Sequence, residues 1–557
     1  MADIQWDVIV VGAGIAGLSS AYRIIKRSPK TRVLVLEAND RVGGRTLSKE
    51  VNYENLSSGS DDSDILDMGA HWICTTQHEI MDLAHELGIR YFRQNVQGRK
   101  IMMVGNSPIR TYNSEIPSVG SYLSPHTWIG LAQLHLGINK IEAMAKTINV
   151  RNPYLHPMAH VYDSETAASF IRSIVGYEEV YDILNTAFIA AFGCDLSQIS
   201  FLNFLTIGKS SGGIMKLFVV EDCGAEEFRV IGGTQQFSNI LADRIKSNLF
   251  KINKTTECHN DILLGHTVKS IVQDRHEEER IEVTCENGEQ FVSRYLVLAA
   301  PPNIIARLKL EPPLPTPQQH LYENMKMGNL AKVFIIYKSP FWLKNGFSGE
   351  YVGKTSLTNL DKRGGGPICV MYDATTEKGL PAIVGFVGGE ALDKWWHQDK
   401  EIFEKAIVHQ MVNCFGHEAE HPEKIIYKNW IEEPNIRGGP VNILSPGNMR
   451  FFNYLRRPHL NIHFAGTNLT YTWMGYLSGA VQSGYTSAAE ILEKFEPHSL
   501  TEKDKEYLSD NESVYSENVN HESGFSYYTL SNHFVPSSIA IGIGIGILIS
   551  RYHKAKL

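Results

Sequence analysis

Two short apolar runs near the start of the chain predict the first two strands of a parallel sheet in an α/β protein. A glycine-rich turn and a predicted helix connect the two runs. The run Asp7–Val11 is apolar after its first residue, which is typical of a parallel strand buried on both faces. The segment Gly12–Gly17 reads Gly-Ala-Gly-Ile-Ala-Gly, and we expect a helix to follow it to about Lys26. The second run, Arg32–Glu37, predicts the next strand and ends in an acid.

The glycine turn and this acid have the spacing of a dinucleotide-binding motif. Gly12 permits the tight turn, Gly14 lets a pyrophosphate approach the backbone, and Gly17 permits close packing of helix on strand. The helix N-terminus supplies N–H groups and the positive end of a dipole to the phosphates. Glu37 stands 20 residues after Gly17 and suits a ribose diol. A glycine turn that binds nothing is the alternative, and the order of strand, turn, helix, strand and acid disfavours it; we therefore assign this turn, Ala13 included, to a nucleotide.

The C-terminal part of the chain has a different pattern. From Ser531 to Ser550 there are 20 residues without Asp, Glu, Lys or Arg, and Arg551 opens a short basic end. Because about 18–20 helical residues span the hydrocarbon core of a bilayer, we expect 531–550 to be a single membrane anchor. Residues 496–530 are rich in Ser, Asn and Glu, which is linker composition. A buried C-terminal helix is the alternative, and the linker composition of the preceding residues disfavours it. Alternating Ile and Gly, which form helices poorly, and a length that is just sufficient count against the anchor.

Composition narrows the class of protein. A chain of 557 residues with 43% hydrophobic residues is ordinary for a globular protein, and its length favours two interlocked domains. With 53 Lys+Arg and 61 Asp+Glu the net charge is −8, and no long basic stripe occurs, which argues against a nucleic-acid partner. The seven cysteines form no CxxC pair and favour a reducing compartment. Met1–Trp6 has no feature of a targeting peptide.

The loop after Glu37 distinguishes between nucleotides. It reads Arg41-Val-Gly-Gly44-Arg45-Thr46, and here the chain resembles the flavin-containing amine oxidase superfamily, which includes monoamine, polyamine and L-amino-acid oxidases. The resemblance implies that this loop wraps FAD with its arginines near the diphosphate. The planar guanidinium group of arginine can donate two hydrogen bonds to one phosphate, and glycines have no side chain that would block the approach of the phosphate.

The resemblance continues along nearly the whole chain. The segment Asp67–Trp72 resembles one that passes close to the flavin, and it contributes Gly69, Ala70, His71 and Trp72 to the implied FAD site. Phe228–Gly233 resembles a Gly-Gly element that opens a helix, Val268 begins a strand that meets the adenine, and Tyr295–Pro302 resembles the strand and turn that leave the nucleotide domain.

The C-terminal flavin motif of the family is matched by Ile462–Thr467 and by Trp473–Val481. The match implies that Gly466, Thr467, Gly475 and Tyr476 bind FAD, and that a helix from about Gly475 directs its N-terminus at the pyrimidine carbonyl of the flavin. The similarity is greatest to monoamine oxidases, which share a C-terminal anchor and the segment Tyr337–Trp342.

Two side chains are implied to be catalytic. Lys332 stands in an otherwise apolar predicted strand; by itself it would be expected to extend to the surface, but the resemblance implies that it holds a water beside flavin N5. Tyr476 matches one wall of the aromatic cage that holds the amine, with a core tyrosine as the alternative. Trp430 resembles a tryptophan near the flavin ring, and core packing explains it nearly as well.

Three positions depart from the monoamine oxidase pattern. Pro440 replaces the cysteine that is bonded to the flavin, so we expect non-covalent FAD. Val441 replaces the second aromatic wall of the cage, which predicts a wider pocket. Asn468 replaces an acid that follows Ala-Gly-Thr in many members, which puts efficient flavin binding in doubt.

These observations predict an α/β protein with a discontinuous Rossmann-like FAD domain and an α+β substrate domain. The expected partition is 1–90, 228–302 and 426–495 for the FAD domain, 91–227 and 303–425 for the substrate domain, 496–530 for a linker and 531–550 for the anchor.

The implied activity is oxidation of an amine to an imine, then to aldehyde and ammonia, with oxygen reduced to hydrogen peroxide. A polyamine oxidase is one alternative, and a catalytically silent FAD-binding membrane protein is another. The expected partners are an amine, O2 and a membrane, with the mitochondrial outer membrane as the expected location and a homodimer left open.

Overall fold

Two large sheets organise the chain in this computed structural model, which describes residues 5–52, 63–103, 109–113, 125–176, 178–220, 223–247, 260–273, 280–353, 355 and 365–516. The first sheet has the strand order β10-β2-β1-β13-β12-β11-β14, and β22 pairs with β13 in parallel. Its strands are β1 (Trp6–Val11), β2 (Val33–Leu36), β10 (Asp261–Leu263), β11 (Val268–Gln273), β12 (Ile281–Cys285), β13 (Gln290–Leu298), β14 (Lys309–Glu311) and β22 (Ile462–Phe464).

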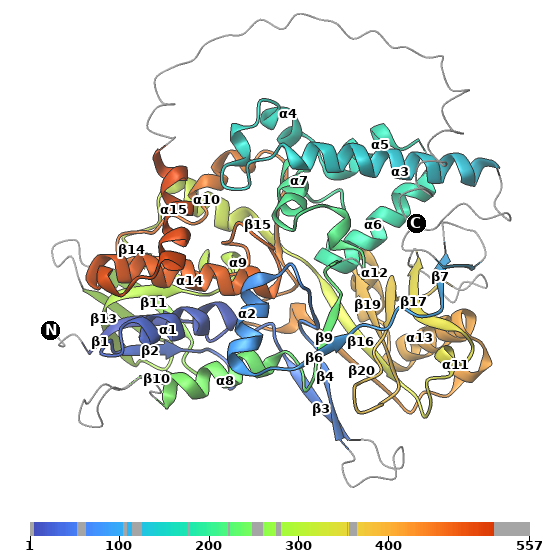
Figure 1. The fold of residues 1–557 in the computed structure, drawn as a ribbon, viewed down its shortest axis with the longest axis horizontal. Coiled ribbons are helices and arrows are strands. Elements are labelled where there is room, and N and C mark those ends of the chain that lie inside the picture. Colours follow the sequence, from blue (N-terminus) through green and yellow to red (C-terminus); the bar gives the residue numbers. More distant parts are fainter. Residues whose placement is uncertain are drawn as a thin grey trace, which may run out of the picture. The chain divides into compact units, whose positions relative to one another are not determined.

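The central strands of the first sheet are buried on both faces. Val8, Ile9 and Val10 of β1 have no exposed surface, as expected for the interior strand of a parallel sheet. One face is covered by the helices α1 (Ile15–Arg27), α8 (Gln235–Lys246) and α14 (Leu477–Phe495), and α2 (His78–Leu87) packs on α14 and α8. Helices α1 and α14, from opposite ends of the chain, lie side by side (Figure 1). Gly484 permits this approach, because a Cβ there would be 2.3 Å from the carbonyl oxygen of Ala16.

The second sheet has the order β20-β16-β19-β18-β17-β7-β8. Its strands are β7 (Arg99–Met103), β8 (Arg110–Tyr112), β16 (Leu330–Ile336), β17 (Phe347–Gly353), β18 (Val370–Asp373), β19 (Ala382–Gly388) and β20 (Lys424–Asn429). Helices α11 (Phe341–Lys344), α12 (Gly389–Trp396) and α13 (Lys400–Phe415) pack on one face. Val333 and Ile335 contact this helical layer, and the alternation of a strand places Lys332 and Phe334 on the opposite face.

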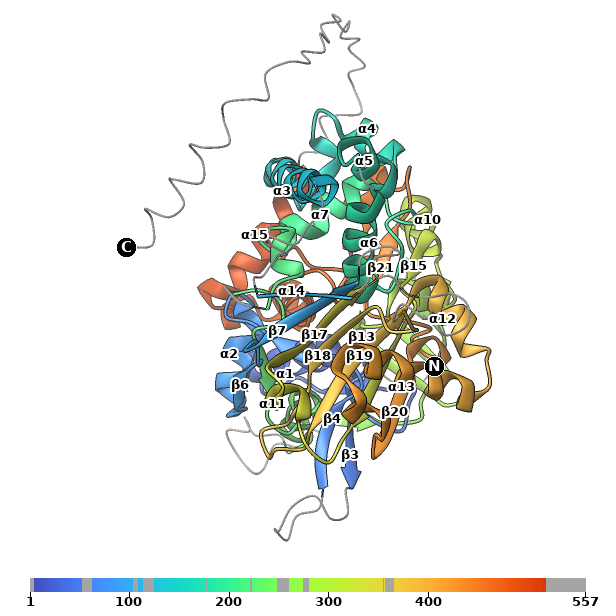
Figure 2. The ribbon, with the colours of Figure 1, turned by 90° about the vertical axis from the view of Figure 1, so that its right-hand side faces the viewer.

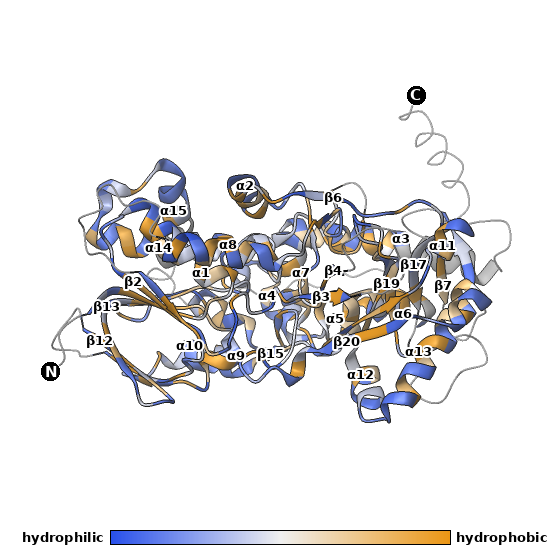
Figure 3. Cartoon of the chain, turned by 90° about the horizontal axis from the view of Figure 1, so that it is seen from below, coloured by the Kyte–Doolittle hydropathy of each residue, from blue (hydrophilic) through white to orange (hydrophobic). Residues whose placement is uncertain are grey.

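A group of helices lies above the second sheet in Figures 1 and 2, and α6 of this group packs on strands β16 to β19. It comprises α3 (Pro125–Lys146), α4 (Ala159–Ser164), α5 (Ala167–Ile174), α6 (Glu178–Phe192) and α7 (Phe201–Ser210). Figure 3 shows apolar residues concentrated in the strands, whereas outer helices such as α13 mix apolar and polar residues. The apolar cores therefore lie between the sheets and the helices that cover them.

The remaining elements are short. Three small sheets pair β3 (Ser48–Asn52) with β4 (Ser63–Asp67), β15 (Met325–Met327) with β21 (Asn442–Leu444), and β9 (Phe228–Val230) with β5 (Trp72–Ile73) and β6 (Tyr91–Arg93). The other helices are α9 (Pro302–Ile305), α10 (Thr316–Asn324) and α15 (Glu502–Ser516), with short 3-10 helices at Pro153–Leu155, Met215–Leu217, His417–Glu420, Trp430–Glu432, Met449–Tyr454 and Pro497–Ser499.

The elements predicted around the nucleotide motif are confirmed. The first strand, the helix and the second strand are β1, α1 and β2, with ends within a residue or two of those expected. The helix expected from about Gly475 is α14, which begins at Leu477. The structure does not test the division into two domains, which stays a prediction; β14 adds residues 309–311 to the first sheet and β20 belongs to the second.

Part of the segment expected to be a linker is helical. Helix α15 occupies Glu502–Ser516, and the side chain of Asp504 within it is fully buried. Its carboxylate forms ion pairs with Arg23 at 2.5 Å and Arg27 at 2.9 Å, both on α1. These contacts, which composition does not reveal, explain why a polar and aperiodic segment folds here.

No helix in the described part of the chain has the length and apolar composition needed to cross a bilayer. The expected anchor, 531–550, lies outside the described residues.

Candidate active site

A cavity of about 320 Å³ is lined by residues from both sheets. Most positions that the sequence assigns to the cofactor or the chemistry line it: Gly12, Gly14, Glu37, Gly44, Arg45, Thr46, Gly69, Ala70, His71, Trp72, Val268, Lys332, Trp430, Gly466, Thr467, Gly475 and Tyr476. Three do not line it: Ala13, Gly17 and Arg41. The cavity thus brings together segments from the first 72 residues of the chain and from its C-terminal motif.

The glycine turn has two kinds of glycine. Gly12 has a φ of +104°, and a Cβ on Gly17 would lie 2.1 Å from the carbonyl oxygen of Gly12, so these two are required by the turn itself. Gly14 is different, because a Cβ there would meet nothing within 4 Å and the residue lines the cavity. Gly14 is also the N-cap of α1, with no side-chain cap and no acid in the first turn. The helix N-terminus is thus open to an anionic group such as a diphosphate.

Glu37 is held in place at the end of β2. Its carboxylate accepts hydrogen bonds from the backbone N–H of Ala13 at 2.7 Å, and from the backbone and side-chain nitrogens of Asn39 at 2.9 and 2.8 Å. Ala13 therefore positions the acid rather than lining the cavity. A fixed carboxylate beside the glycine turn is the arrangement that suits a ribose.

The two arginines that flank Gly43-Gly44 have different environments. Arg41 donates to the carbonyl oxygen of Gly44 at 2.9 Å and does not line the cavity. Arg45 lines it and donates to the carbonyl oxygen of Pro440 at 2.6 Å. Burial lowers the pKa of Arg45 to about 10, so it is cationic at neutral pH. One arginine, not two, is available to a diphosphate in this cavity.

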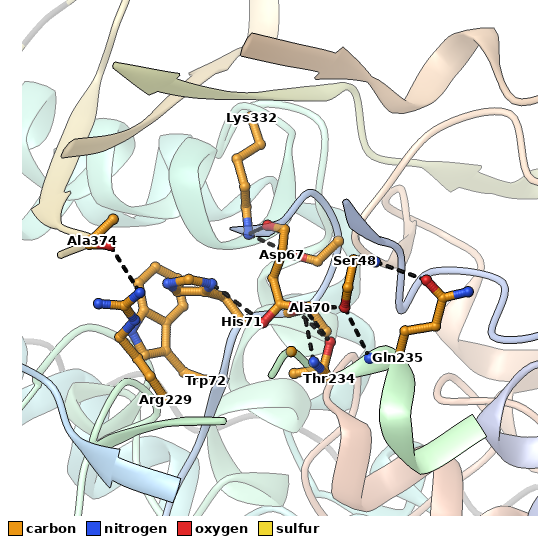
Figure 4. Close-up of polar contacts among 12 residues, drawn as sticks. Ser48, Asp67, Ala70, His71, Trp72, Arg229, Thr234, Gln235, Lys332 and Ala374 are labelled. Atoms are coloured by element: carbon orange, nitrogen blue, oxygen red, sulfur yellow. Dashed lines mark hydrogen bonds and ion pairs between the residues drawn. The ribbon is translucent and has the colours of Figure 1, made fainter. Parts of the chain in front are cut away.

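Lys332 lies in the wall of the cavity that the second sheet contributes (Figure 4). Its Nζ donates to the backbone carbonyl oxygens of Asp67 at 3.0 Å and Gly69 at 2.5 Å. The rings of Trp72 and Phe386 have their centroids 5.7 and 5.5 Å from this nitrogen. Burial lowers the pKa of Lys332 to about 7, although the charge of Asp67 opposes the shift. A protonated Lys332 has three N–H donors, and the two carbonyls use two of them.

The side chain of Asp67 fixes the segment that carries these carbonyls. Its Oδ1 accepts from the hydroxyl of Ser48 at 2.6 Å and from the backbone N–H of Thr234 at 2.8 Å (Figure 4). The hydroxyl of Thr234 donates in turn to the carbonyl oxygen of Ala70 at 2.8 Å. Gly69 is required for the same packing, because a Cβ there would lie 2.0 Å from the carbonyl oxygen of Arg45. The small residues of this segment therefore serve the protein's own packing.

His71 is buried beside this network. Its Nδ1 is 3.6 Å from Oδ2 of Asp67, and neither ring nitrogen forms a hydrogen bond within the described residues. Burial, together with the charges of Lys332 and Arg229, lowers the pKa of His71 to about 3, against the opposing effect of Asp67. Trp72, whose ring lies edge-on to His71, donates from Nε1 to Oε1 of Gln94 at 2.9 Å.

We expect His71 to make the protein sensitive to acid. An unfolded histidine has a pKa of about 6.5, so between pH ~3 and ~6.5 the unfolded state binds a proton that the folded state does not, and stability falls as pH falls. The slope is about 1.4 kcal/mol per pH unit for one proton. In urea denaturation between pH ~4 and ~7, His71→Gln should lose less stability on acidification than the wild type. Equal pH dependence of the two proteins would contradict this.

Tyr476 and Trp430 both line the cavity, and Tyr476 does so at the start of α14. Tyr476 is the N-cap of this helix, and its carbonyl oxygen accepts from the hydroxyl of Thr467 at 2.7 Å. Its ring lies edge-on to Trp473 with centroids 5.1 Å apart, and burial raises its pKa well above the usual value. Trp430 donates from Nε1 to the carbonyl oxygen of Met68 at 3.0 Å. The helix N-terminus has no side-chain cap and is open to a partial negative charge.

The three departures from the family pattern have distinct surroundings. Pro440 and Val441 both line the cavity, and Val441 lies against Gly475. Asn468 does not line it; its Nδ2 donates to the carbonyl oxygen of Asn442 at 2.8 Å. A carboxylate could not donate this hydrogen bond, so the amide serves the backbone next to Val441.

Three further lining residues, Glu226, Tyr372 and Phe386, stand in no motif of the sequence. Phe386 is the register partner of Lys332 on the adjacent strand β19, so strand pairing places it there. Tyr372 lies on β18, next to β19. Glu226 stands two residues before Phe228–Gly233, and this proximity to a motif is its only signal.

Comparison with known proteins agrees with this geometry. The profile of the flavin containing amine oxidoreductase family matches residues 15–492. A probable flavin-containing monoamine oxidase A from Dictyostelium discoideum is 30% identical over 491 residues, which are 88% of this chain and 98% of that protein. The flavin-containing amine oxidase A of Equus caballus is 30% identical over 504 residues, 88% and 86% of the two chains.

Solved structures show the same fold. Cyclohexylamine oxidase from Brevibacterium oxydans has a TM-score of 0.75 and 26% identity, over 88% of this chain and 99% of that one. A putrescine oxidase variant has a TM-score of 0.76 at 24% identity, over 88% and 99% of the two chains. The chain therefore belongs to the flavin-containing amine oxidoreductases and is an amine oxidase whose cofactor is FAD.

Proposed function

We propose that this amine oxidase converts a primary amine to an imine, with Lys332 and Tyr476 as the residues that act on the reacting atoms. The observation that carries the proposal is that both side chains line one cavity, which Gly12 and Gly14 of the glycine turn also line. The residues fit FAD, since the cavity offers an open helix N-terminus at Gly14, a cation at Arg45 and a fixed carboxylate at Glu37.

The reaction balances as follows. The α-carbon loses a hydride and the nitrogen a proton, which leaves an imine, and water then gives an aldehyde and ammonia. Bound FAD supplies the two-electron acceptor. The two electrons and two protons reach O2, which becomes hydrogen peroxide.

Lys332 would serve as the cation at the reacting edge of the cavity. The carbonyls of Asp67 and Gly69 fix its position, and the aromatic rings around it exclude water. A fixed cation in a dry environment stabilises negative charge far more than one in solution. Tyr476 would orient the amine through its aromatic face. Val441 offers no second ring opposite, so the proposed amine site is wider than a cage of two aromatic residues.

Amine-dependent peroxide formation tests this function. Purified holoprotein should produce hydrogen peroxide with at least one member of a panel of primary amines. The rate should rise with pH up to about 7, because only the neutral amine releases hydride readily, and should stop rising where Lys332 loses its proton. No peroxide with any amine, from neutral to alkaline pH, would contradict the proposal.

We infer that FAD is bound without a covalent link. Pro440 has no nucleophile, and it lines the cavity at the position where the resemblance implies the flavin-linking cysteine. We expect acid precipitation of the holoprotein to leave the yellow flavin in the supernatant. Flavin that stays with the precipitated chain after washing and proteolysis would contradict this expectation.

A C-terminal membrane anchor at 531–550 is supported by the sequence alone, and we propose the mitochondrial outer membrane as its location. The apolar stretch has the length for one crossing, with basic residues after it. We expect the full-length chain to sediment with membranes after alkaline carbonate washing, and a chain without residues 531–557 to stay in the supernatant. Equal partitioning of both forms would contradict the anchor, and co-localisation with an outer-membrane marker tests the location.

A further inference from the structure

A short segment of the chain, residues 434–440, forms part of the cavity wall, and we refer to it as the strap. Four of its residues line the cavity: Asn435, Ile436, Gly439 and Pro440. The side chain of Ile436 is buried, whereas Pro434 and Arg437 are exposed at the surface. The strap therefore has an inner side that lines the cavity and an outer side that contacts solvent.

The two ends of the strap are held in different ways. At the Gly439 end the contact is between backbones, because the N–H of Gly439 donates to the carbonyl oxygen of Gly328 at 2.8 Å. Arg437 has a φ of +60° and Gly438 a φ of +127°, so the chain turns sharply just before this contact. Towards the Asn435 end the contacts to other segments come from side chains, and these can break without any change in the backbone.

Asn435 connects the strap to the nucleotide loop. Its Nδ2 donates to Oδ1 of Asn39 at 3.1 Å, although the two residues are 396 positions apart. Asn39 donates in turn from Nδ2 to Oε1 of Glu37 at 2.8 Å, which is the carboxylate that suits the ribose. A carboxylate only accepts, so this second bond turns the amide oxygen of Asn39 towards the strap. Asn435 then has to supply the donor.

A further side chain supports the middle of the strap. Nδ2 of Asn303 donates to the carbonyl oxygen of Ile436 at 3.0 Å. This contact does not involve the nucleotide loop, whereas Asn435 bonds to a residue that also fixes Glu37. Asn435 is thus the side chain that joins the strap to the wall on which the nucleotide motif lies.

We propose that the hydrogen bond between Asn435 and Asn39 is a latch that controls the exchange of FAD. While it is formed, the strap separates the part of the cavity beside Glu37 from solvent. A dinucleotide passes this point only after the latch has broken and the strap has moved aside. The inference rests on the non-covalent cofactor proposed above, since Pro440 provides no bond that would retain the flavin.

A latch of this kind has a kinetic signature of its own. Both of its partners are side chains of the protein, so it stabilises the closed strap to the same extent with and without the cofactor. A contact that does not discriminate between the two forms cannot change the affinity. Its loss therefore accelerates uptake and release of FAD by the same factor. A residue that binds the cofactor directly behaves differently, because its loss weakens the affinity.

Rates of FAD exchange in the full-length protein test the proposal. Asn435→Ala removes the amide, and Asn435→Leu keeps a similar shape without a donor or a charge. We expect both variants to take up and to release FAD about two- to tenfold faster than the wild type, the effect of one hydrogen bond between neutral groups, with Kd within about twofold. The control is Asn345→Ala, which loses a surface hydrogen bond to Glu418 outside the cavity and should keep wild-type rates.

Flavin fluorescence measures both rates, on mixing FAD with the flavin-free chain and on dilution of the holoenzyme. In an Asn39→Ala background, which already lacks the acceptor, Asn435→Ala should change neither rate by more than about twofold. Wild-type rates in both Asn435 variants would overturn the latch. A weaker affinity with unchanged uptake would overturn it too, because Asn435 would then contact the cofactor itself.

These measurements need no oxidation of an amine. Faster exchange in the Asn435 variants supports the latch even if no amine yields peroxide, a result that would refute only the proposed reaction. Flavin that stays on the chain after acid precipitation would refute the non-covalent link, and the rate of uptake by the flavin-free chain then decides for or against the latch by itself.

Discussion

Replacing Lys332 by methionine is expected to lower kcat/KM for amine oxidation by about 10²–10³-fold, the cost of removing one preorganised electrostatic partner from an active site. Methionine keeps the length of the side chain and its packing against Trp72 and Phe386. The carbonyls of Asp67 and Gly69 lose their donor, which costs about 1–3 kcal/mol each when such a group stays buried and unsatisfied. Relief from burying an amine whose pKa is only about 7 offsets part of this cost.

The control for this substitution is Lys338→Met. Lys338 follows the same strand but is 76% exposed and pairs with Glu423 at the surface. We expect it to keep wild-type activity and a wild-type flavin spectrum. Lys332→Met should also keep its flavin, so that lost activity with retained yellow colour separates an effect on the reaction from loss of the cofactor. Retention of more than half of the wild-type kcat/KM by Lys332→Met would refute the assignment.

The part of the first sheet that is specified by local sequence pattern could be predicted from the sequence. The apolar run of β1, the glycine turn and the acid at the end of β2 specify a strand, a turn and a strand without reference to the rest of the chain. The second sheet could not be predicted in this way. Its order joins β7 and β8 to strands that follow more than 200 residues later, and such pairings are set by tertiary packing.

In the candidate site, too, local pattern predicts some features and tertiary packing determines others. Arg41 and Arg45 flank Gly43-Gly44 and look equivalent in the sequence, yet only Arg45 lines the cavity, because Arg41 bonds to the backbone of its own loop. Helix α15 folds because Asp504 meets two arginines from the other end of the chain, which its composition does not predict.

The site residues that could not be predicted from sequence pattern are those that stand outside recognised motifs. Lys332 could be singled out only by family resemblance, since its burial depends on carbonyls more than 260 residues away. Glu226 and Tyr372 stand in no motif, and they line the same cavity as Lys332 because β18 and the segment before β9 enclose that space. Local pattern therefore predicts where the cofactor binds, whereas the packing of the second sheet determines which other side chains line the cavity.

Gly14→Ala and Gly17→Ala make the same change three residues apart, but we expect different effects. Gly17→Ala should lower the stability of the fold, and Gly14→Ala should weaken FAD binding. Gly17→Ala places a Cβ 2.1 Å from the carbonyl oxygen of Gly12 and 3.0 Å from the Cβ of Ala299. Neither neighbour can move without shifting the turn or β13, so we expect a loss of about 1–3 kcal/mol or more in the free energy of unfolding. Thermal denaturation of the holoprotein measures it.

Gly14→Ala should lower the free energy of unfolding by no more than about 1 kcal/mol. Its φ of −70° suits alanine and its Cβ meets no atom of the protein, although alanine is a poorer N-cap than glycine. The new methyl group instead lies where the diphosphate approaches the N-terminus of α1. Loss of one hydrogen bond to a charged group costs about 1.5–3 kcal/mol, which weakens FAD binding roughly tenfold to a hundredfold. Flavin fluorescence released on dilution measures this affinity. Wild-type FAD affinity in Gly14→Ala would show that the phosphates bind elsewhere, because a cavity that accepts the methyl group beside the helix N-terminus cannot hold them there.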